Sequence, residues 1–260
     1  MNESGKIKVT FLGTGTSAGV PMIGCNCAIC TSKDPRDKRL RSSVMITDGE
    51  HNYVIDTGSD FRQQMLREQV KTLSAVIFTH EHKDHVAGMD DIRAFNYVLQ
   101  KKIDIYATLR VQEALVREFP YVFHDFKYPG VPEVNMITID EHPFNIEGLE
   151  FIPIEVLHYK LPVNAYRVGD FTYITDANFI SEKEKEKIKG SRIVVINALR
   201  REKHVSHFNL EEALELIKEL KPEKAYLTHI SHQLGKHSDV EKELPPNVFL
   251  AYDGFEIEMS

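Results

Sequence analysis

The feature that most constrains this chain is the run Thr-His-Glu-His-Lys-Asp-His at residues 79–85, which directly follows an apolar segment. Its H-x-H-x-D-H pattern places three imidazoles and the Asp84 carboxylate within six positions, at His80, His82, Asp84 and His85. Packing of a hydrophobic core does not require such a density of ligand-type side chains. On a strand or tight loop residues i and i+2 point the same way, so His80 and His82 can bind one ion. The other two side chains then face a second ion, and the spacing predicts a metal centre at the end of a buried strand.

The composition is that of an ordinary globular protein. The 260 residues are 42% hydrophobic and 27% charged, which predicts a single domain over residues 1–260. The formal net charge is −7 and there is no long Lys/Arg tract, so binding to bulk nucleic acid or to an anionic membrane is not favoured. No apolar run is long enough to span a bilayer and the amino-terminal residues lack a signal-peptide core, which predicts a cytoplasmic protein. The sequence leaves a homodimer open.

The apolar periodicity predicts alternating strands and helices. Strands are expected over residues 7–12, 43–47, 53–55, 75–78, 103–107, 193–196 and 225–227, and helices over 60–70, 110–119 and 209–220. In the first of these helices Phe61, Met65 and Leu66 are expected on one face. In the last, Asn209 can cap the helix and Glu212 can complete a capping box. Short alternating runs over residues 134–175 predict a β-meander.

Three further ligand-type residues lie far apart, at His158, Asp176 and His229. Taken alone, each has an ordinary structural explanation as a core histidine or a turn aspartate. Together they complete a di-metal centre, which needs two ions about 3.5–4 Å apart, a bridging carboxylate and about three protein ligands for each ion. The expected ligands of one ion are His80, His82 and His158. Those of the other are Asp84, His85 and His229, with Asp176 between the two ions.

The three cysteines, Cys25, Cys27 and Cys30, lie within six residues. An odd number of clustered thiols argues against a disulfide framework. Unpaired buried thiols are the alternative to a metal site, because the C-x-C-x-x-C spacing is tighter than the usual zinc spacing.

These motifs together resemble the metallo-β-lactamase fold family. Its ligand signature is an H-x-H-x-D-H run followed in order by a later His, Asp and His. Four segments are similar to the PhnP-type phosphodiesterase branch: 11–21 (FLGTGTSAGVP), 24–30 (GCNCAIC), 55–62 (IDTGSDFR) and 228–232 (THISH). The resemblance extends over residues 7–235. It implies an α/β (α+β) fold, a four-layer αβ/βα sandwich with a dinuclear site at one edge.

The resemblance also implies roles for residues outside the dinuclear set. It implies a structural zinc held by Cys25, Cys27, Cys30 and His232, and the residues themselves agree, since Cys₃His is a closed tetrahedral zinc set. His237 is a rival fourth ligand. Asp56 is implied to orient a ligand histidine, with a simple turn residue as the alternative.

A catalytic histidine is implied just before the helix at 209–220. His207 matches best, and it would protonate the departing alkoxide or hydrogen-bond the phosphoryl oxygen. His204 is the alternative for this role, and either could be an ordinary residue at the start of a helix.

The function implied is hydrolysis of a small cyclic or nucleotide-type phosphodiester. Two divalent active-site ions, zinc or manganese, would bridge the attacking hydroxide, with Asp84 and His207 as catalytic residues. The nearest alternative is tRNA 3′-end processing, as in RNase Z. Only seventeen residues separate His158 from Asp176, too few for the exosite arm of that family. β-Lactam or thioester hydrolysis has less support from the motifs.

A non-hydrolytic carrier, like the relative in pyrroloquinoline-quinone biosynthesis, is the alternative from another class. Such a protein is expected to lose part of the ligand set, whereas all seven candidate ligands are present here.

Overall fold

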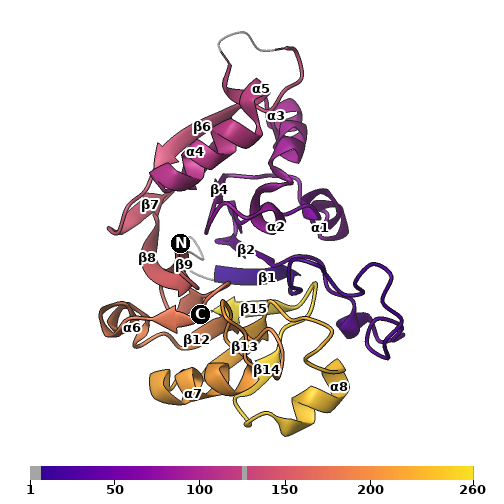
Figure 1. Cartoon of the computed structure of the whole chain (residues 1–260). Coiled ribbons are helices and arrows are strands. Elements are labelled where there is room, and N and C mark those ends of the chain that lie inside the picture. The colour runs from indigo at the N-terminus through magenta and orange to yellow at the C-terminus, as the bar shows by residue number, and fades with distance from the viewer. Residues whose placement is uncertain (1–6, 125–127, 260) are drawn as a thin grey trace. The chain divides into compact units, whose positions relative to one another are not determined.

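The computed structural model describes residues 7–124 and 128–259 (Figure 1). It contains two compact units. The first comprises Met1–Leu12, Ser43–Asp140 and Gly254–Ser260, and the second comprises Gly13–Ser42 and Glu141–Asp253. Each unit has its own β-sheet with its own helices. The single domain expected over residues 1–260 stays a prediction.

The sheet of the first unit has seven strands in the order β15-β1-β2-β3-β4-β5-β6. Their bounds are β1 (Ile7–Gly13), β2 (Ser43–Thr47), β3 (Asn52–Ile55), β4 (Ala75–Ile77), β5 (Ile103–Ala107), β6 (Val134–Thr138) and β15 (Glu256–Met259). The strands from β3 to β6 run parallel. Parallel strands are covered on both faces, which is why β4 is a short apolar run with every residue buried.

The helices of the first unit are short. They are α1 (Phe61–Arg67), α2 (Lys83–Val86), α3 (Arg93–Leu99), α4 (Leu109–Glu118) and α5 (Pro120–Phe123), with a 3₁₀ turn at Met89–Ile92. Helix α1 is shorter than expected, and the prediction for Leu66 was wrong. Phe61 and Met65 are buried, but Leu66 is 61% exposed, because adjacent helical residues point about 100° apart.

The sheet of the second unit has the order β11-β8-β9-β10-β12-β13-β14, and β7 pairs with β8. The bounds are β7 (Phe144–Ile146), β8 (Leu149–His158), β9 (Leu161–Val168), β10 (Phe171–Tyr173), β11 (Phe179–Ile180), β12 (Ile193–Asn197), β13 (Lys224–Thr228) and β14 (Val248–Leu250). Strands β7 to β10 form the expected antiparallel meander. Strand β6 was wrongly included in it. It pairs in parallel with β5 in the first unit, after the crossover through α4 and α5, and alternation within a strand does not reveal its partner.

The second unit also contains α6 (Glu182–Ile188), α7 (Leu210–Leu220), α8 (His237–Val240) and 3₁₀ turns at Pro35–Asp37 and Glu241–Glu243. The capping box predicted for α7 is present. The Asn209 side chain accepts a hydrogen bond from the Glu212 backbone N–H at 2.9 Å, and the Glu212 carboxylate accepts one from the Asn209 N–H at 3.1 Å. Helix α7 therefore begins at a fixed residue, and the loop before it carries the candidate histidines 204 and 207.

Within the described residues, no helix combines the length and the apolar character needed to cross a membrane.

Candidate metal sites

The first unit brings its four predicted ligands together where β4 leads into α2. The ring centroid of His80 lies 4.6 Å from that of His82 and 4.2 Å from that of His85. The Asp84 carboxylate lies 3.3 Å from His85 Nε2. His80 and His85 are buried and His82 is exposed. The compact run in the sequence is thus a compact cluster in space.

Asp56 anchors two of these histidines. This fully buried carboxylate lies 2.6 Å from His85 Nδ1, and it accepts hydrogen bonds from the Thr79 backbone N–H at 2.9 Å and the Thr79 hydroxyl at 2.8 Å. The Thr79 hydroxyl has only one proton, so it must accept the hydrogen bond from His80 Nδ1 at 3.0 Å. Both imidazoles therefore carry their proton on Nδ1 and present the Nε2 lone pair. Burial raises the pKa of Asp56, while the hydrogen bonds from His85 and Thr79 oppose that rise.

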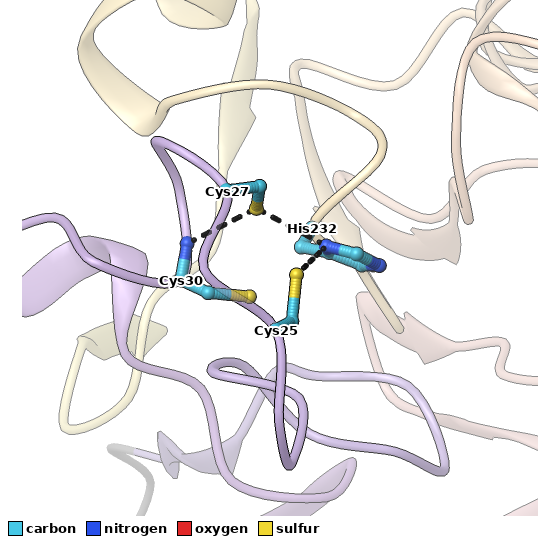
Figure 2. A group of neighbouring side chains, drawn as sticks. All are labelled: Cys25, Cys27, Cys30 and His232. Atoms are coloured by element: carbon cyan, nitrogen blue, oxygen red, sulfur yellow. Dashed lines mark hydrogen bonds between the residues drawn. The ribbon is translucent and has the colours of Figure 1, made fainter.

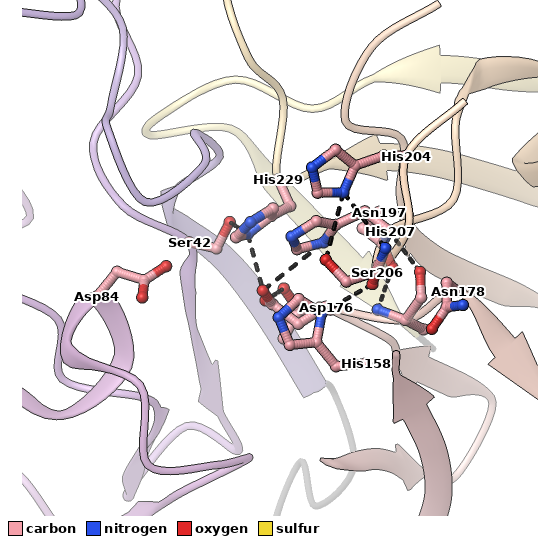
Figure 3. Close-up of polar contacts among 12 residues, drawn as sticks. Ser42, Asp84, His158, Asp176, Asn178, Asn197, His204, Ser206, His207 and His229 are labelled. Atoms are coloured by element: carbon pink, nitrogen blue, oxygen red, sulfur yellow. Dashed lines mark hydrogen bonds and ion pairs between the residues drawn. The ribbon is translucent and has the colours of Figure 1, made fainter. Parts of the chain in front are cut away.

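The second unit brings together the other three predicted ligands and both candidate catalytic histidines (Figure 3). The Asp176 carboxylate lies 3.3 Å from His229 Nδ1 and 3.8 Å from His207 Nδ1. The ring of His207 lies between those of His158 and His229, with centroid distances of 4.5 Å and 4.8 Å. The ring of His204 is 5.2 Å from that of His207.

The candidate ligand histidines of this unit are also held through Nδ1, as His80 and His85 are in the first unit. His158 Nδ1 donates to the Ser206 carbonyl at 2.7 Å. Ser42 donates its hydroxyl proton to the Gly15 carbonyl at 2.9 Å, so it accepts from His229 Nδ1 at 3.1 Å. A metal-ligating histidine commonly donates its second ring N–H to such an oxygen, which fixes the tautomer. Imidazoles held through Nδ1, together with the carboxylates of Asp84 and Asp176, are a donor set that fits divalent metal ions.

His207 differs from these histidines. Its Nδ1 is buried and forms no hydrogen bond with any residue of 7–124 or 128–259. Burial, with the nearby charge of His229, lowers the pKa of His207 to about 3. One ligand-type atom each from His158, Asp176 and His207 lie within 4.8 Å of one another, so His207 could also serve as a ligand. The sequence alone did not suggest that second role.

Backbone conformation sets three of the site residues apart. Asp56, Asp176 and His229 all have positive φ, at 67°, 54° and 54°. Each follows a strand of its own sheet, β3, β10 or β13. Non-glycine residues adopt this conformation uncommonly, and such outliers cluster at functional sites.

The cysteines form a separate cluster inside the second unit (Figure 2). The sulfur atoms of Cys25 and Cys27 lie 3.4 Å and 3.3 Å from His232 Nδ1. One ligand atom from each of these residues and from Cys30 lie within 4.8 Å of one another. The Cys30 backbone N–H and His232 lower the pKa of Cys27 to about 6, whereas burial raises the pKa of Cys30 to about 11. The set has the donors and the spacing of a tetrahedral Cys₃His zinc site.

His237, the rival fourth ligand, lies in another network. Its Nδ1 accepts from the buried Arg39 guanidinium at 3.2 Å, and its backbone N–H donates to Asp37 at 2.7 Å. Its Nε2 lies 3.4 Å from Glu241. The geometry therefore places His232, and not His237, against the cysteine sulfurs.

Comparison with known proteins identifies the family. The model of the Beta-lactamase superfamily domain matches residues 51–230. The chain belongs to this superfamily. A crystal structure of a diphosphatase of the PhnP family is 36% identical, with a TM-score of 0.92 over 98% of both chains. The predicted metallo-β-lactamase fold and the predicted likeness to the PhnP branch are confirmed.

Two other proteins that resemble this chain have different functions in their names. The octanoyltransferase of Porphyromonas gingivalis is 37% identical over 253 residues, which are 96% of this chain but 51% of the relative. The chain therefore spans about half of that protein. Zinc-bound PqqB from Methylobacterium extorquens has a TM-score of 0.76 over 97% of this chain and 100% of its own, at 19% identity. That likeness shows the fold alone.

Sequence reasoning missed the groups that orient the ligands. Thr79, Ser42 and the Ser206 carbonyl each hold an imidazole, and none was singled out as doing so. Thr79 was visible as the residue before His80, but its partner Asp56 lies 23 positions away. It stays a prediction that the four ligands of the first unit and the three of the second form one dinuclear metal centre.

Proposed function

We propose that this chain is a metal-dependent phosphodiesterase that acts on a small phosphodiester of the cyclic or nucleotide type. The observation that carries the proposal is the shared anchoring of four histidines. His80, His85, His158 and His229 each engage an oxygen through Nδ1, which fixes the orientation of the ring and the tautomer. The similarity to a diphosphatase of the PhnP family supports phosphorus chemistry.

The proposed centre combines the ligand sets of the two units. His80, His82 and His158 would hold one divalent ion, Asp84, His85 and His229 the second, and Asp176 both. Two such ions would supply Lewis acidity toward the phosphoryl oxygens and would lower the pKa of a bound water. Asp56 keeps the ligand imidazoles in the required tautomer.

His207 is the proposed catalytic histidine. It lies among the ligands of the second unit, and it lacks the oxygen anchor that fixes the tautomer of its neighbours. A ring N–H of the neutral His207 would donate a hydrogen bond to the phosphoryl oxygen and stabilise the negative charge that develops there in the transition state. His204 lies beside His207, with ring centroids 5.2 Å apart, and its substitution is the matched control for that of His207.

The Cys₃His cluster is proposed to hold one structural zinc. It joins the loop of Cys25, Cys27 and Cys30 to His232, which lies three residues after His229. Zinc there would fix the segment that carries an active-site ligand. In Cys30→Ser we expect the loss of one zinc per chain and a lower Tm, with the other metal ions retained. An unchanged zinc content would contradict this assignment.

A nuclease and a carrier remain as outcomes of the same test. Strands β8 and β9 are joined at the pair His158 and Leu161 by a two-residue turn, so no tRNA-binding arm lies between these two strands. A carrier function has no support in the ligand set, because all seven side chains persist. Octanoyl transfer is the activity of a relative about twice as long.

The test combines metal analysis with a panel of substrates. We expect the metal-loaded chain to hydrolyse bis(p-nitrophenyl) phosphate and 2′,3′-cyclic nucleotides. His207→Ala should lower kcat by about 10²–10³-fold at unchanged metal content, and His204→Ala much less. Loss of metal from His207→Ala would make that residue a ligand. Failure of the fully loaded protein on every diester would favour a carrier, and cleavage of precursor tRNA at matching rates would favour a nuclease.

A further inference from the structure

A tyrosine occupies a turn position where glycine is the usual residue. Strands β8 and β9 are joined by Tyr159 and Lys160, since His158 pairs with Leu161. Both turn residues are described, and of the two only Tyr159 has positive φ, at 59°. This pattern is that of a type II′ turn, whose first central residue is normally glycine. A bulky side chain in this conformation is an outlier that points to a function.

The turn is fixed to the segment that carries a candidate ligand. The Tyr159 backbone N–H donates to the Asn178 side-chain oxygen at 2.6 Å, and the Asn178 N–H donates to the Leu157 carbonyl at 2.8 Å. Asn178 lies two residues after Asp176, and Tyr159 directly follows His158. All of these residues belong to the second unit. The backbone of Tyr159 is therefore next in sequence to one proposed ligand and is hydrogen-bonded to the segment that carries another.

The ring itself is open to solvent. Tyr159 is 55% exposed, and its hydroxyl forms no hydrogen bond with any residue that the structure describes. The Lys160 ammonium lies 5.4 Å from the ring centroid. Exposed apolar side chains also flank other site residues: Phe179 is 53% exposed and pairs with Leu157, and Val205 is 65% exposed two residues before His207. An apolar or aromatic part of a substrate would find partners here.

We infer that Tyr159 is a specificity residue that stacks on an aromatic group of the substrate, a nucleobase in a nucleotide-type diester, with Lys160 beside it to meet further negative charge. The inference rests on the proposed function and specifies its substrate class. Stacking of a base on an aromatic side chain tolerates any base, since every base has a π-face. A sugar separates the base from the phosphate of a nucleotide, so a ring one residue past a metal ligand is well placed to meet the base.

The test uses two diesters that differ only in the base: the methyl ester of adenosine 5′-phosphate and the methyl ester of ribose 5-phosphate. Tyr159→Gly removes the ring and suits the backbone of the turn, so the variant should fold. We expect its KM for the adenosine ester to rise about 5–150-fold with little change in kcat, and its constants for the ribose ester to stay unchanged. Tyr159→Phe should match the wild type, because the hydroxyl has no assigned role.

Glu147 provides a matched control. It has positive φ, 48°, in the β7–β8 turn of the same unit and is exposed, but lies next to no candidate ligand. Glu147→Gly should therefore leave both esters unaffected. Equal losses on the two esters in Tyr159→Gly would mark the turn as structural only and overturn the inference. So would an unchanged KM for the adenosine ester.

A binding measurement separates this inference from the proposed reaction. Calorimetry would compare adenosine 5′-phosphate with ribose 5-phosphate on the metal-loaded wild type and Tyr159→Gly. Tighter binding of the nucleotide that Tyr159→Gly abolishes would support the stacking role, even if no ester were hydrolysed and the proposed phosphodiesterase failed. Hydrolysis of both esters with equal binding of the two phosphates would overturn the stacking role and leave the phosphodiesterase intact.

Discussion

The two units hold their candidate ligands in different ways. In the first, four ligands lie within six residues, and one buried carboxylate, Asp56, orients two of them. In the second, His158, Asp176 and His229 come from three separate strand ends, and each histidine has its own anchor, the Ser206 carbonyl or the Ser42 hydroxyl. Two ligands of the first set thus share one anchor, whereas the histidines of the second set have separate anchors and meet only when the sheet is assembled.

This difference predicts how each set fails. A change at the shared anchor should disturb two ligands at once, while a change at an individual anchor should disturb one. Removal of a metal-binding carboxylate should be equally severe in either unit, because the proposed centre requires both sets.

The largest expected effect is the loss of a ligand carboxylate. Asp84→Asn and Asp176→Asn should each lower kcat/KM for a phosphodiester by about 10³-fold or more, roughly 4 kcal/mol of transition-state stabilisation, with the loss of bound metal. Asp170→Asn, at an exposed turn of the second unit, should leave both quantities unchanged. An inactive Asp176→Asn beside a fully active Asp84→Asn would mean that the second unit works alone, and the centre proposed from both units would be wrong.

The next largest effect is expected from substitutions of the residues that hold the ligand histidines through Nδ1. Asp56→Asn cannot accept all three hydrogen bonds, so two imidazoles lose their fixed tautomer, and metal affinity should fall about 10–100-fold. Ser42→Ala removes one neutral hydrogen bond to His229, a contribution of about 0.5–1.5 kcal/mol, and affinity should fall about tenfold or less.

Competition with a chromophoric chelator would measure both affinities. Ser191→Ala is the control, because this buried hydroxyl lies 2.7 Å from that of Thr172 and contacts no histidine. Its metal affinity should not change. If Asp56→Asn and Ser42→Ala lost the same amount of metal affinity, the proposed difference between a shared and an individual anchor would be wrong.

The same contrast explains what the sequence could predict. The cluster at His80 was readable from its residues, because neighbours in sequence are neighbours in space. His158, Asp176 and His229 were grouped only by the number of ligands that a di-metal centre requires and by the family signature, since spacing does not reveal which strand ends meet. The capping box of α7 was predicted correctly because all of its contacts are local.

What failed or was missed depends on tertiary structure. Leu66 was placed on the buried face of α1, and β6 was placed in the wrong sheet. The hydroxyl groups of Thr79 and Ser42 acquire their roles only when residues 23 and 187 positions away are brought to them. Local patterns carry no information about such partners.

The smallest expected effect concerns helix caps, where the two units again differ. Asn209 at the start of α7 makes a reciprocal capping box and donates from its side chain to the Arg201 carbonyl at 3.0 Å. Thr108 at the start of α4 accepts a single, long hydrogen bond, 3.5 Å from the Val111 nitrogen. Asn209→Ala should therefore cost about 1–2 kcal/mol of stability and Thr108→Ala about 0.5 kcal/mol.

Hydrogen exchange at the first turns of α4 and α7 would measure the two losses of stability separately, since it reports local opening in each unit. Asn209→Asp should restore most of the stability, because a carboxylate keeps the acceptor for the Glu212 N–H and suits the positive end of the helix. Asn209 lies two residues after His207, so fraying of α7 should also loosen the loop that carries the proposed catalytic histidine. A modest fall in kcat in Asn209→Ala, absent from Thr108→Ala, is therefore expected. A larger loss of protection in Thr108→Ala than in Asn209→Ala would show that the capping box does not govern how that loop is held.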